Sequence, residues 1–170
     1  MQERKGVQTF KGGPLTLLGP EIKVGDQAPN FKVLTNGLQE VTLDNYKGKT
    51  LILSVAPSLD TSVCSAQTHR FNTEVANLPA GVEVLTITAD LPFAQGRFCG
   101  AENIKIQTLS DHRAMSFGDA YGTHIKELRL EARSIFVVGK DGKVKYVEYV
   151  KEMTTHPDYD KALAAAKANA

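Results

Sequence analysis

Cysteine is scarce in this chain. The 170 residues include only Cys64 and Cys99, far below the cysteine density of small secreted proteins held together by disulfides. The two lie far apart, so there is no Cys-x-x-Cys pair of the kind found in dithiol reductases and zinc ribbons. The four histidines show neither His-Glu-x-x-His nor a tight Cys/His spacing. We therefore expect neither a disulfide scaffold nor a structural metal site.

An excess of charge and long apolar runs are also missing. The 20 Lys and Arg residues nearly balance the 19 Asp and Glu residues, which argues against nucleic acid and membrane surfaces as partners. No stretch approaches the roughly 20 consecutive apolar residues that cross a bilayer. The charged start, Met1–Gly6, lacks the apolar segment of a secretory signal, so we expect a cytoplasmic protein.

Length and composition fit one globular domain. With 42% hydrophobic and 23% charged residues, the chain is close to the globular average. Its length lies within the roughly 100 to 200 residues typical of one domain. We therefore predict a single domain over residues 1–170. Val7–Phe10 and Leu15–Leu18, on either side of a Gly-rich turn, predict an N-terminal hairpin extension over roughly residues 1–20.

The middle of the chain has the pattern of an α/β fold. Leu51–Ala56 is a nearly continuous apolar run, typical of a strand covered on both faces, and Val82–Thr88 is a second one. Between them, apolar residues at helical spacing from Phe71 to Leu78 predict a helix that ends at Pro79. A parallel strand–helix–strand unit is the simplest arrangement.

The second half of the chain continues this alternation. The expected elements are a helix over Pro92–Ala101, an irregular stretch from Ile104, a short helix capped by Ser110-Asp111 and ending near Phe117, an exposed connection over residues 118–131, a hairpin of Ser134–Val138 and Val144–Val150, and a helix over residues 159–169. The order β-α-β-α followed by β-β-α resembles the thioredoxin fold with an N-terminal extension and one insertion.

Cys64 lies in the first turn of the predicted helix, where free backbone N–H groups and the helix dipole stabilise a thiolate. It can be interpreted as a nucleophile or as a small buried hydrophobe, and its position alone does not separate the two. Thr61 places a hydroxyl one turn before the sulfur, where it could donate to a thiolate and an arriving oxygen. Pro57 and Thr61 would equally serve to end a strand and cap a helix.

The whole string decides between these interpretations. Pro57-x-x-x-Thr61-x-x-Cys64 after an apolar strand resembles the peroxidatic motif of the peroxiredoxins. Residues 57–64 (PSLDTSVC) and 89–102 (ADLPFAQGRFCGAE) are similar to the thiol peroxidase subgroup, the atypical two-cysteine bacterial enzymes. The resemblance covers almost all of the chain. It implies an α/β, thioredoxin-like fold of the peroxiredoxin type, with a central sheet flanked by helices and an N-terminal β-hairpin extension.

The resemblance also implies a mechanism. Cys64 would be the peroxidatic cysteine, reducing hydrogen peroxide and alkyl hydroperoxides and becoming a sulfenic acid. Cys99 would be the resolving cysteine, forming a disulfide with Cys64 that thioredoxin reduces. Arg133 would supply the cation beside the sulfur, with Thr61 and Pro57 completing the site. The resemblance implies a homodimer and no cofactor.

Several alternatives stay open on the residues alone. Cys99 would be an inert buried thiol, Arg133 a charge at a strand edge, and Arg129 a second candidate cation. The chain could also be a non-enzymatic thioredoxin-fold redox sensor or binding module, whereas a disulfide reductase is disfavoured by the missing Cys-x-x-Cys. His69 and His156 are not expected to be catalytic. No GxGxxG or phosphate-loop spacing suggests a nucleotide. Because a disulfide needs Cα atoms within ~7 Å, we expect local unwinding around Cys64 or Cys99.

Overall fold

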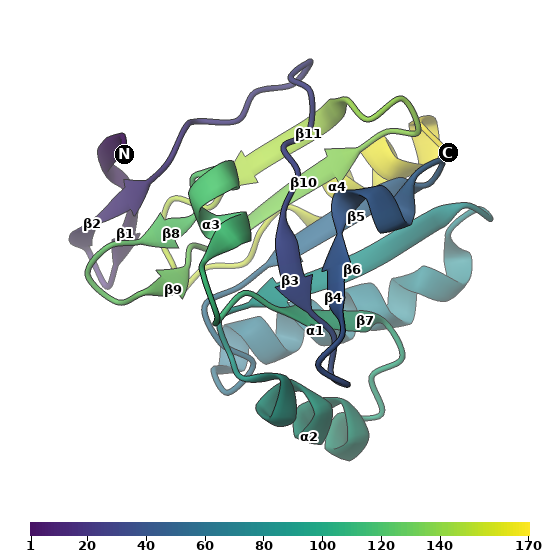
Figure 1. Ribbon diagram of the computed structural model, residues 1–170, viewed down its shortest axis with the longest axis horizontal. Coiled ribbons are helices and arrows are strands. Elements are labelled where there is room, and N and C mark those ends of the chain that lie inside the picture. Colours follow the sequence, from purple (N-terminus) through teal and green to yellow (C-terminus); the bar gives the residue numbers. More distant parts are fainter.

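A seven-stranded sheet runs through the molecule, and a four-stranded sheet lies beside it at the N-terminal end (Figure 1). The computed structural model describes residues 1–170. In sheet order, the large sheet consists of β11 (Val144–Tyr149), β10 (Ser134–Val138), β5 (Thr50–Val55), β6 (Val82–Thr88), β7 (Gln107–Ser110), β3 (Lys32–Leu34) and β4 (Glu40–Thr42). The small sheet consists of β1 (Glu3–Phe10), β2 (Gly13–Leu18), β8 (His124–Ile125) and β9 (Leu130–Glu131).

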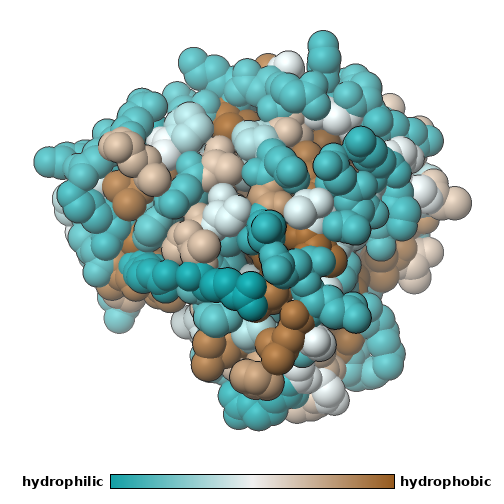
Figure 2. All heavy atoms as spheres, viewed as in Figure 1, coloured by the Kyte–Doolittle hydropathy of each residue, from teal (hydrophilic) through white to brown (hydrophobic).

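Four α-helices and two short 3₁₀ helices complete the fold; all but the last α-helix, which follows the last strand, lie between strands. They are α1 (Ser62–Glu74), α2 (Pro92–Glu102), α3 (Ser116–Tyr121), α4 (Tyr159–Ala168), η1 (Leu43–Tyr46) and η2 (Val75–Asn77). None of the helices combines the length and apolar character that crossing a membrane requires. In Figure 2 the viewed face is mostly hydrophilic, and its apolar atoms form small groups, the clearest of them at the lower end, where α2 lies in Figure 1.

The centre of the large sheet is built from parallel strand–helix–strand units. β5 and β6 pair in parallel across α1, as the sequence predicts, and β6 and β7 pair in parallel across α2. On its other side β5 pairs antiparallel with β10, so it lies inside the sheet. Every residue of β5 is buried, which explains why this strand is an almost unbroken apolar run.

Alternate residues of β5 pack into two cores on opposite faces of the sheet. Leu51 and Leu53 pack in one cluster with Phe117 of α3. Ile52 packs in another with Phe71 of α1 and with apolar residues of α4. In Figure 1, α1 and α4 accordingly lie behind the sheet and α3 in front of it. The start of α1, which carries Cys64, is thereby held at the end of an interior strand.

The stretch from Ile104, predicted to be irregular, contains the strand β7. This strand has no apolar run because two of its buried residues are polar. Thr108 donates to the side-chain oxygen of Asn36 at 2.9 Å, and Ser110 donates to the backbone carbonyl of Asp90. Hydrogen bonds thus make burial of these side chains tolerable, and the period-2 hydrophobic signal is lost.

The helix predicted from Ser110 begins only at Ser116. Asp111 lies several residues before this helix, on the other side of a turn, but it still caps it. Its carboxylate accepts hydrogen bonds from the backbone N–H groups of Phe117 (3.1 Å) and Gly118 (2.8 Å). The predicted exposed connection after residue 117 is confirmed only for residues 126–129, which are exposed. Gly118 lies inside α3, and Glu131 in β9 is completely buried. The many charges of this segment indicated exposure, whereas its fold buries one of them.

The N-terminal hairpin of β1 and β2 turns at Lys11 and Gly12, which both have positive φ (50° and 83°). β1 also bonds to the segment that follows β11. The Thr9 N–H donates to the Lys151 carbonyl at 2.8 Å, and the Met153 N–H donates to the Thr9 carbonyl at 2.8 Å. These bonds hold residues 151–153 in place at the side of the sheet.

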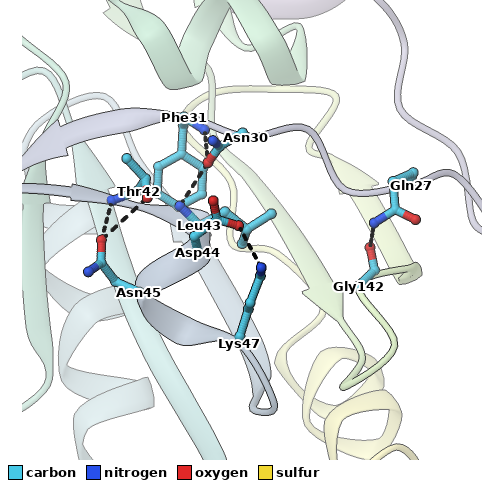
Figure 3. A network of polar contacts seen from close by, with 9 residues as sticks. All are labelled: Gln27, Asn30, Phe31, Thr42, Leu43, Asp44, Asn45, Lys47 and Gly142. Carbon is cyan, nitrogen blue, oxygen red and sulfur yellow. Dashed lines mark hydrogen bonds and ion pairs between the residues drawn. The ribbon is translucent and has the colours of Figure 1, made fainter.

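The largest cleft, about 410 Å³, lies at the first residues of β5, at the opposite end of that strand from Cys64. Figure 3 shows polar contacts beside it. The side-chain oxygen of Asn30 accepts from two backbone N–H groups, one of them that of Leu43 at 3.0 Å, and Gln27 donates to the Gly142 carbonyl at 3.1 Å. These bonds hold loops together, and no cysteine lines the cleft, so the candidate site lies elsewhere.

Candidate active site

Cys64 is the third residue of α1, and Thr61 is the residue that precedes the helix, with extended backbone geometry (φ −100°, ψ 150°). The first N–H groups of a helix have no acceptor inside it, so the positive end of α1 surrounds the sulfur. Cys64 is a free thiol and is fully buried. The strand, the loop and the helix together fix where the sulfur lies.

Arg133 lies directly before β10, 2% exposed, and its guanidinium contacts Cys64. Its Nη2 donates to the Sγ of Cys64 at 3.2 Å. Nη1 donates to the side-chain oxygen of Gln67 at 2.9 Å, and Nε donates to the backbone carbonyl of Met153 at 2.8 Å. Every guanidinium nitrogen therefore has an acceptor, and the orientation of the group is fixed.

No carboxylate forms an ion pair with Arg133, although its guanidinium is buried. A buried cation without a counter-ion is unfavourable. Of the three hydrogen-bond partners of Arg133, only Cys64 can carry a negative charge. A guanidinium has donors enough to hold a sulfur and an incoming oxygen together.

Gln67 was not predicted from the sequence. Its side-chain nitrogen donates to the Ser54 hydroxyl at 2.8 Å and to the Val55 carbonyl at 3.2 Å, while its oxygen accepts from Arg133. Gln67 thus links β5 to the guanidinium. Its signal in the sequence is weak but real: a polar side chain lies three residues after Cys64, on the helix face that packs against the sheet.

A pocket of about 260 Å³ opens over Arg133. Its lining consists of Phe10, Pro57, Thr61, Ser62, Val63, Arg133, Met153 and Thr154. The Thr61 hydroxyl lines this pocket but donates to the Ser58 carbonyl at 3.1 Å rather than to the sulfur of Cys64. Phe10, from the N-terminal hairpin, was not predicted to belong here. Four apolar side chains, three hydroxyl groups and the Arg133 cation thus line the pocket.

Cys99 lies in α2, partly buried, with its Sγ 3.5 Å from the Thr108 hydroxyl of β7. The helix of Cys64, by contrast, is bonded through Gln67 to β5. β6 separates β5 from β7, so the strands that these helices contact lie roughly 10 Å apart. The two cysteines are free thiols on separate helices.

The other candidate residues lie outside this arrangement. Arg129 is exposed and donates to the His112 carbonyl at 3.2 Å. His69 meets Glu102 at 3.1 Å on the surface, and the ring of His156 contacts the Tyr159 hydroxyl at 2.7 Å. No three His, Cys, Asp or Glu side chains come together in a way that could hold a metal ion.

Glu131, two residues before Arg133, forms a buried pair of carboxyl groups with Asp111. Burial, and then the negative charge of Asp111, raise the pKa of Glu131 well above its ordinary value. Burial also raises the pKa of Asp111, although hydrogen bonds from Gly118 and Phe117 act in the opposite direction. Since one oxygen of Glu131 has no donor, we infer that Glu131 carries the proton and donates it to Asp111.

Because folding holds the Glu131 proton more tightly, the free energy of unfolding should depend on pH. The unfolded chain loses the Glu131 proton near pH 4.3, about the ordinary value, whereas the folded chain holds it to higher pH. The stabilisation is complete below that pH and is lost as pH rises through the raised pKa. Glu131→Gln supplies a neutral donor at every pH, so it should raise the unfolding free energy at pH 8 by about 1 kcal/mol or more and have little effect at pH 4.

Urea unfolding at several pH values measures this effect. The exposed Glu21→Gln is the matched control, with no expected change at either pH. If Glu131→Gln is equally destabilising at pH 4 and pH 8, Glu131 is not the proton carrier of the pair.

Comparisons with known proteins place this architecture in a family. The family model described as Redoxin matches residues 23–163. Thiol peroxidase from Bacillus subtilis is 64% identical over 161 residues, which cover 94% of this chain and 96% of that protein. Thiol peroxidase from Halalkalibacterium halodurans is 62% identical with the same coverage.

Solved structures agree with these relatives. A peroxiredoxin-like protein from Aquifex aeolicus superimposes with a TM-score of 0.91 at 38% identity, covering 100% of both chains. Thiol peroxidase from Chromobacterium violaceum has a TM-score of 0.81 at 19% identity, covering 96% of this chain and 98% of that one, which supports the fold alone.

The chain therefore belongs to the redoxin family and has the thioredoxin-like fold that the sequence resemblance implied. Within this family it falls among the peroxiredoxins, in the thiol peroxidase group, and it is a peroxidase enzyme.

Proposed function

We propose that this enzyme reduces hydrogen peroxide and alkyl hydroperoxides through Cys64, forms a disulfide with Cys99, and is recycled by thioredoxin. The contact between Arg133 and Cys64 carries the proposal. A buried guanidinium with no carboxylate partner lies 3.2 Å from the sulfur, at the positive end of a helix and below an open pocket. A structural cysteine needs none of these features.

The proposed reaction has two chemical steps before reduction. The Cys64 thiolate attacks the terminal oxygen of the hydroperoxide: an S–O bond forms, the O–O bond breaks, and the departing alkoxide or hydroxide takes a proton to leave as alcohol or water. The Cys99 thiol then attacks the sulfenic sulfur, forming the S–S bond and releasing water. A thioredoxin dithiol returns two electrons and restores both thiols.

The residues around the sulfur have distinct proposed roles. Arg133 stabilises the thiolate and the charge that develops on the peroxide oxygens. The Thr61 hydroxyl, which lines the pocket, can turn from the Ser58 carbonyl toward the bound peroxide. Pro57 forms a rigid wall of the pocket, and the apolar residues of its lining, Phe10 and Met153 among them, accommodate the organic part of an alkyl hydroperoxide.

Joining the two sulfurs requires movement. A disulfide needs Cα atoms within about 7 Å, and Cys64 and Cys99 are held by different helices against different strands. We therefore propose that the first turn of α1 and part of α2 unwind after Cys64 is oxidised. Free thiols in the folded helices represent the state that is ready for peroxide.

Sustained turnover tests the proposed function. With thioredoxin, thioredoxin reductase and NADPH present, each hydroperoxide molecule added should consume one NADPH over many cycles. A non-enzymatic redox sensor would instead be oxidised once and stop, and a disulfide reductase would reduce insulin without peroxide. Either of these results would contradict the proposal.

Cys99→Ser separates resolution from the peroxide step. Because Cys99 acts only after oxygen transfer, the first turnover of this variant should stay within about twofold of the parent, whereas thioredoxin-linked cycling should be lost. Mass spectrometry after one equivalent of peroxide should show an oxygen added at Cys64, and excess peroxide should carry it on to sulfinic acid. Cycling at the parent rate would mean that Cys99 is not the resolving cysteine.

We also propose, from the resemblance, that residues 1–170 act as one domain and that the enzyme is a cytoplasmic homodimer. Light scattering after gel filtration measures the mass of the particle, and a mass equal to one chain would contradict the dimer.

A further inference from the structure

The carboxylate of Asp90 is bonded to the loop that leads to Cys64. Asp90 lies between β6 and α2, two residues before Pro92 begins that helix. Its Oδ1 accepts from the Ser58 hydroxyl at 2.7 Å, and its Oδ2 accepts from the Leu59 N–H at 2.8 Å. Ser58 and Leu59 belong to the loop between β5 and α1, so a side chain beside α2 holds the entrance to α1.

The same residue is anchored on the side of Cys99. The Thr88 hydroxyl donates to the Asp90 carboxylate at 2.8 Å, and Gln95, buried in α2, donates both to that hydroxyl (2.9 Å) and to the Leu109 carbonyl (2.9 Å). The Ser110 hydroxyl donates to the backbone carbonyl of Asp90. Asp90 therefore joins the start of α2, the helix that carries Cys99, to β6 and β7.

One carboxylate thus connects the segments that precede both cysteines. Hydrogen bonds to an ionised group are about twice as strong as neutral ones, so these contacts resist separation of the two segments. The Asp90 side chain contacts neither Cys64 nor Arg133, and it does not line the 260 Å³ pocket. It can therefore affect movement of the helices without taking part in the attack on peroxide.

We propose that Asp90 is a latch that holds the Ser58–Leu59 loop against the start of α2, and that its release sets the rate at which Cys64 and Cys99 form their disulfide. This inference rests on the proposed function. While the latch is closed, the sulfenic acid waits at Cys64, where a second peroxide can oxidise it. Opening the latch frees both segments together, because their bonds share one carboxylate. Asp90 is a positioning residue, not a catalytic one.

Rapid-mixing kinetics separate the two steps. Asp90→Asn loses the charge and at least one acceptor, and it should speed disulfide formation about tenfold while the rate of Cys64 oxidation stays within about twofold to threefold of the parent. The fraction of Cys64 converted to sulfinic acid at high peroxide should fall correspondingly. The amide of Leu59 should exchange its hydrogen faster in the same variant.

Two further variants give this test its controls. Asp60→Asn changes the same loop but removes only an exposed contact to Arg97 at 3.8 Å, so both rates should stay near those of the parent. Ser58→Ala removes the hydroxyl that donates to the Asp90 carboxylate, so it should also speed disulfide formation. In the double variant with Asp90→Asn, the rate of disulfide formation should rise by less than the product of the two single fold-increases, because both substitutions remove one shared interaction.

The outcomes distinguish this inference from the function on which it rests. If the parent enzyme forms the disulfide but neither Asp90→Asn nor Ser58→Ala changes the rate of that step, the latch is wrong and the proposed function stands. An equal slowing of both steps in the two variants would likewise assign Asp90 to general stability and overturn the latch. If peroxide does not oxidise Cys64 in the parent, it is the proposed function that fails.

Discussion

Cys64→Ser should abolish peroxide consumption, lowering turnover at least a thousandfold. Serine is nearly the size of cysteine, so the variant can occupy the same buried place in α1, but its hydroxyl is neither ionised nor a strong nucleophile at neutral pH. The positive helix end and Arg133 would remain in position with no thiolate to use them.

Rapid-mixing measurement of the peroxide consumed in the first turnover measures this effect, and far-UV circular dichroism shows whether the fold is retained. Cys99→Ser is the matched control, because it also replaces a cysteine by serine but should keep the first turnover. Substantial steady turnover by Cys64→Ser would contradict the assignment of the nucleophile.

Arg133→Ala should slow oxidation of Cys64 by about a hundredfold or more, the usual effect of removing one donor from a site where charge develops. Arg133→Lys should have a smaller effect, because it keeps the charge but cannot bond Cys64, Gln67 and the Met153 carbonyl at the same time. Alkylation of Cys64 by iodoacetamide should slow in the same order, since it also requires the thiolate.

The control for Arg133 is Arg129→Ala, which removes an exposed side chain bonded only to the His112 carbonyl. Stopped-flow measurement of peroxide oxidation should give the parent rate for this variant. A normal rate in Arg133→Ala, with a defect in Arg129→Ala, would show that Arg129 is the cation of the site.

Local patterns predicted the elements around Cys64 well, because a strand-length apolar run, a proline that ends it and a helical spacing of apolar residues follow one another closely there. The apolar run of β5, Pro57 and the helical spacing of Phe71 place Cys64 in the first turn of a helix, and the structure has it there. The contact with Arg133 could not be derived in this way, since it joins positions 69 residues apart. The resemblance to a family supplied Arg133, and the fold brings the two side chains together.

The elements that the sequence did not predict share a physical reason. Glu131 was expected to be exposed because it follows several charged residues, but it is buried against Asp111, a partner that only the folded chain supplies. β7 lacks an apolar pattern because buried Thr108 and Ser110 have hydrogen-bond partners on distant segments. In each case a long-range polar contact outweighs the local tendency of the sequence.

Time-resolved peptide mass spectrometry of the parent enzyme, quenched after one equivalent of hydroperoxide, tests the central claim most directly. At the earliest times the peptide containing Cys64 should carry one added oxygen. That species should then give way to a linked pair of peptides containing Cys64 and Cys99, which thioredoxin returns to two free thiols. Oxygen that first appears on Cys99, or on neither cysteine while peroxide is consumed, would contradict the assignment of Cys64 as the residue that attacks peroxide.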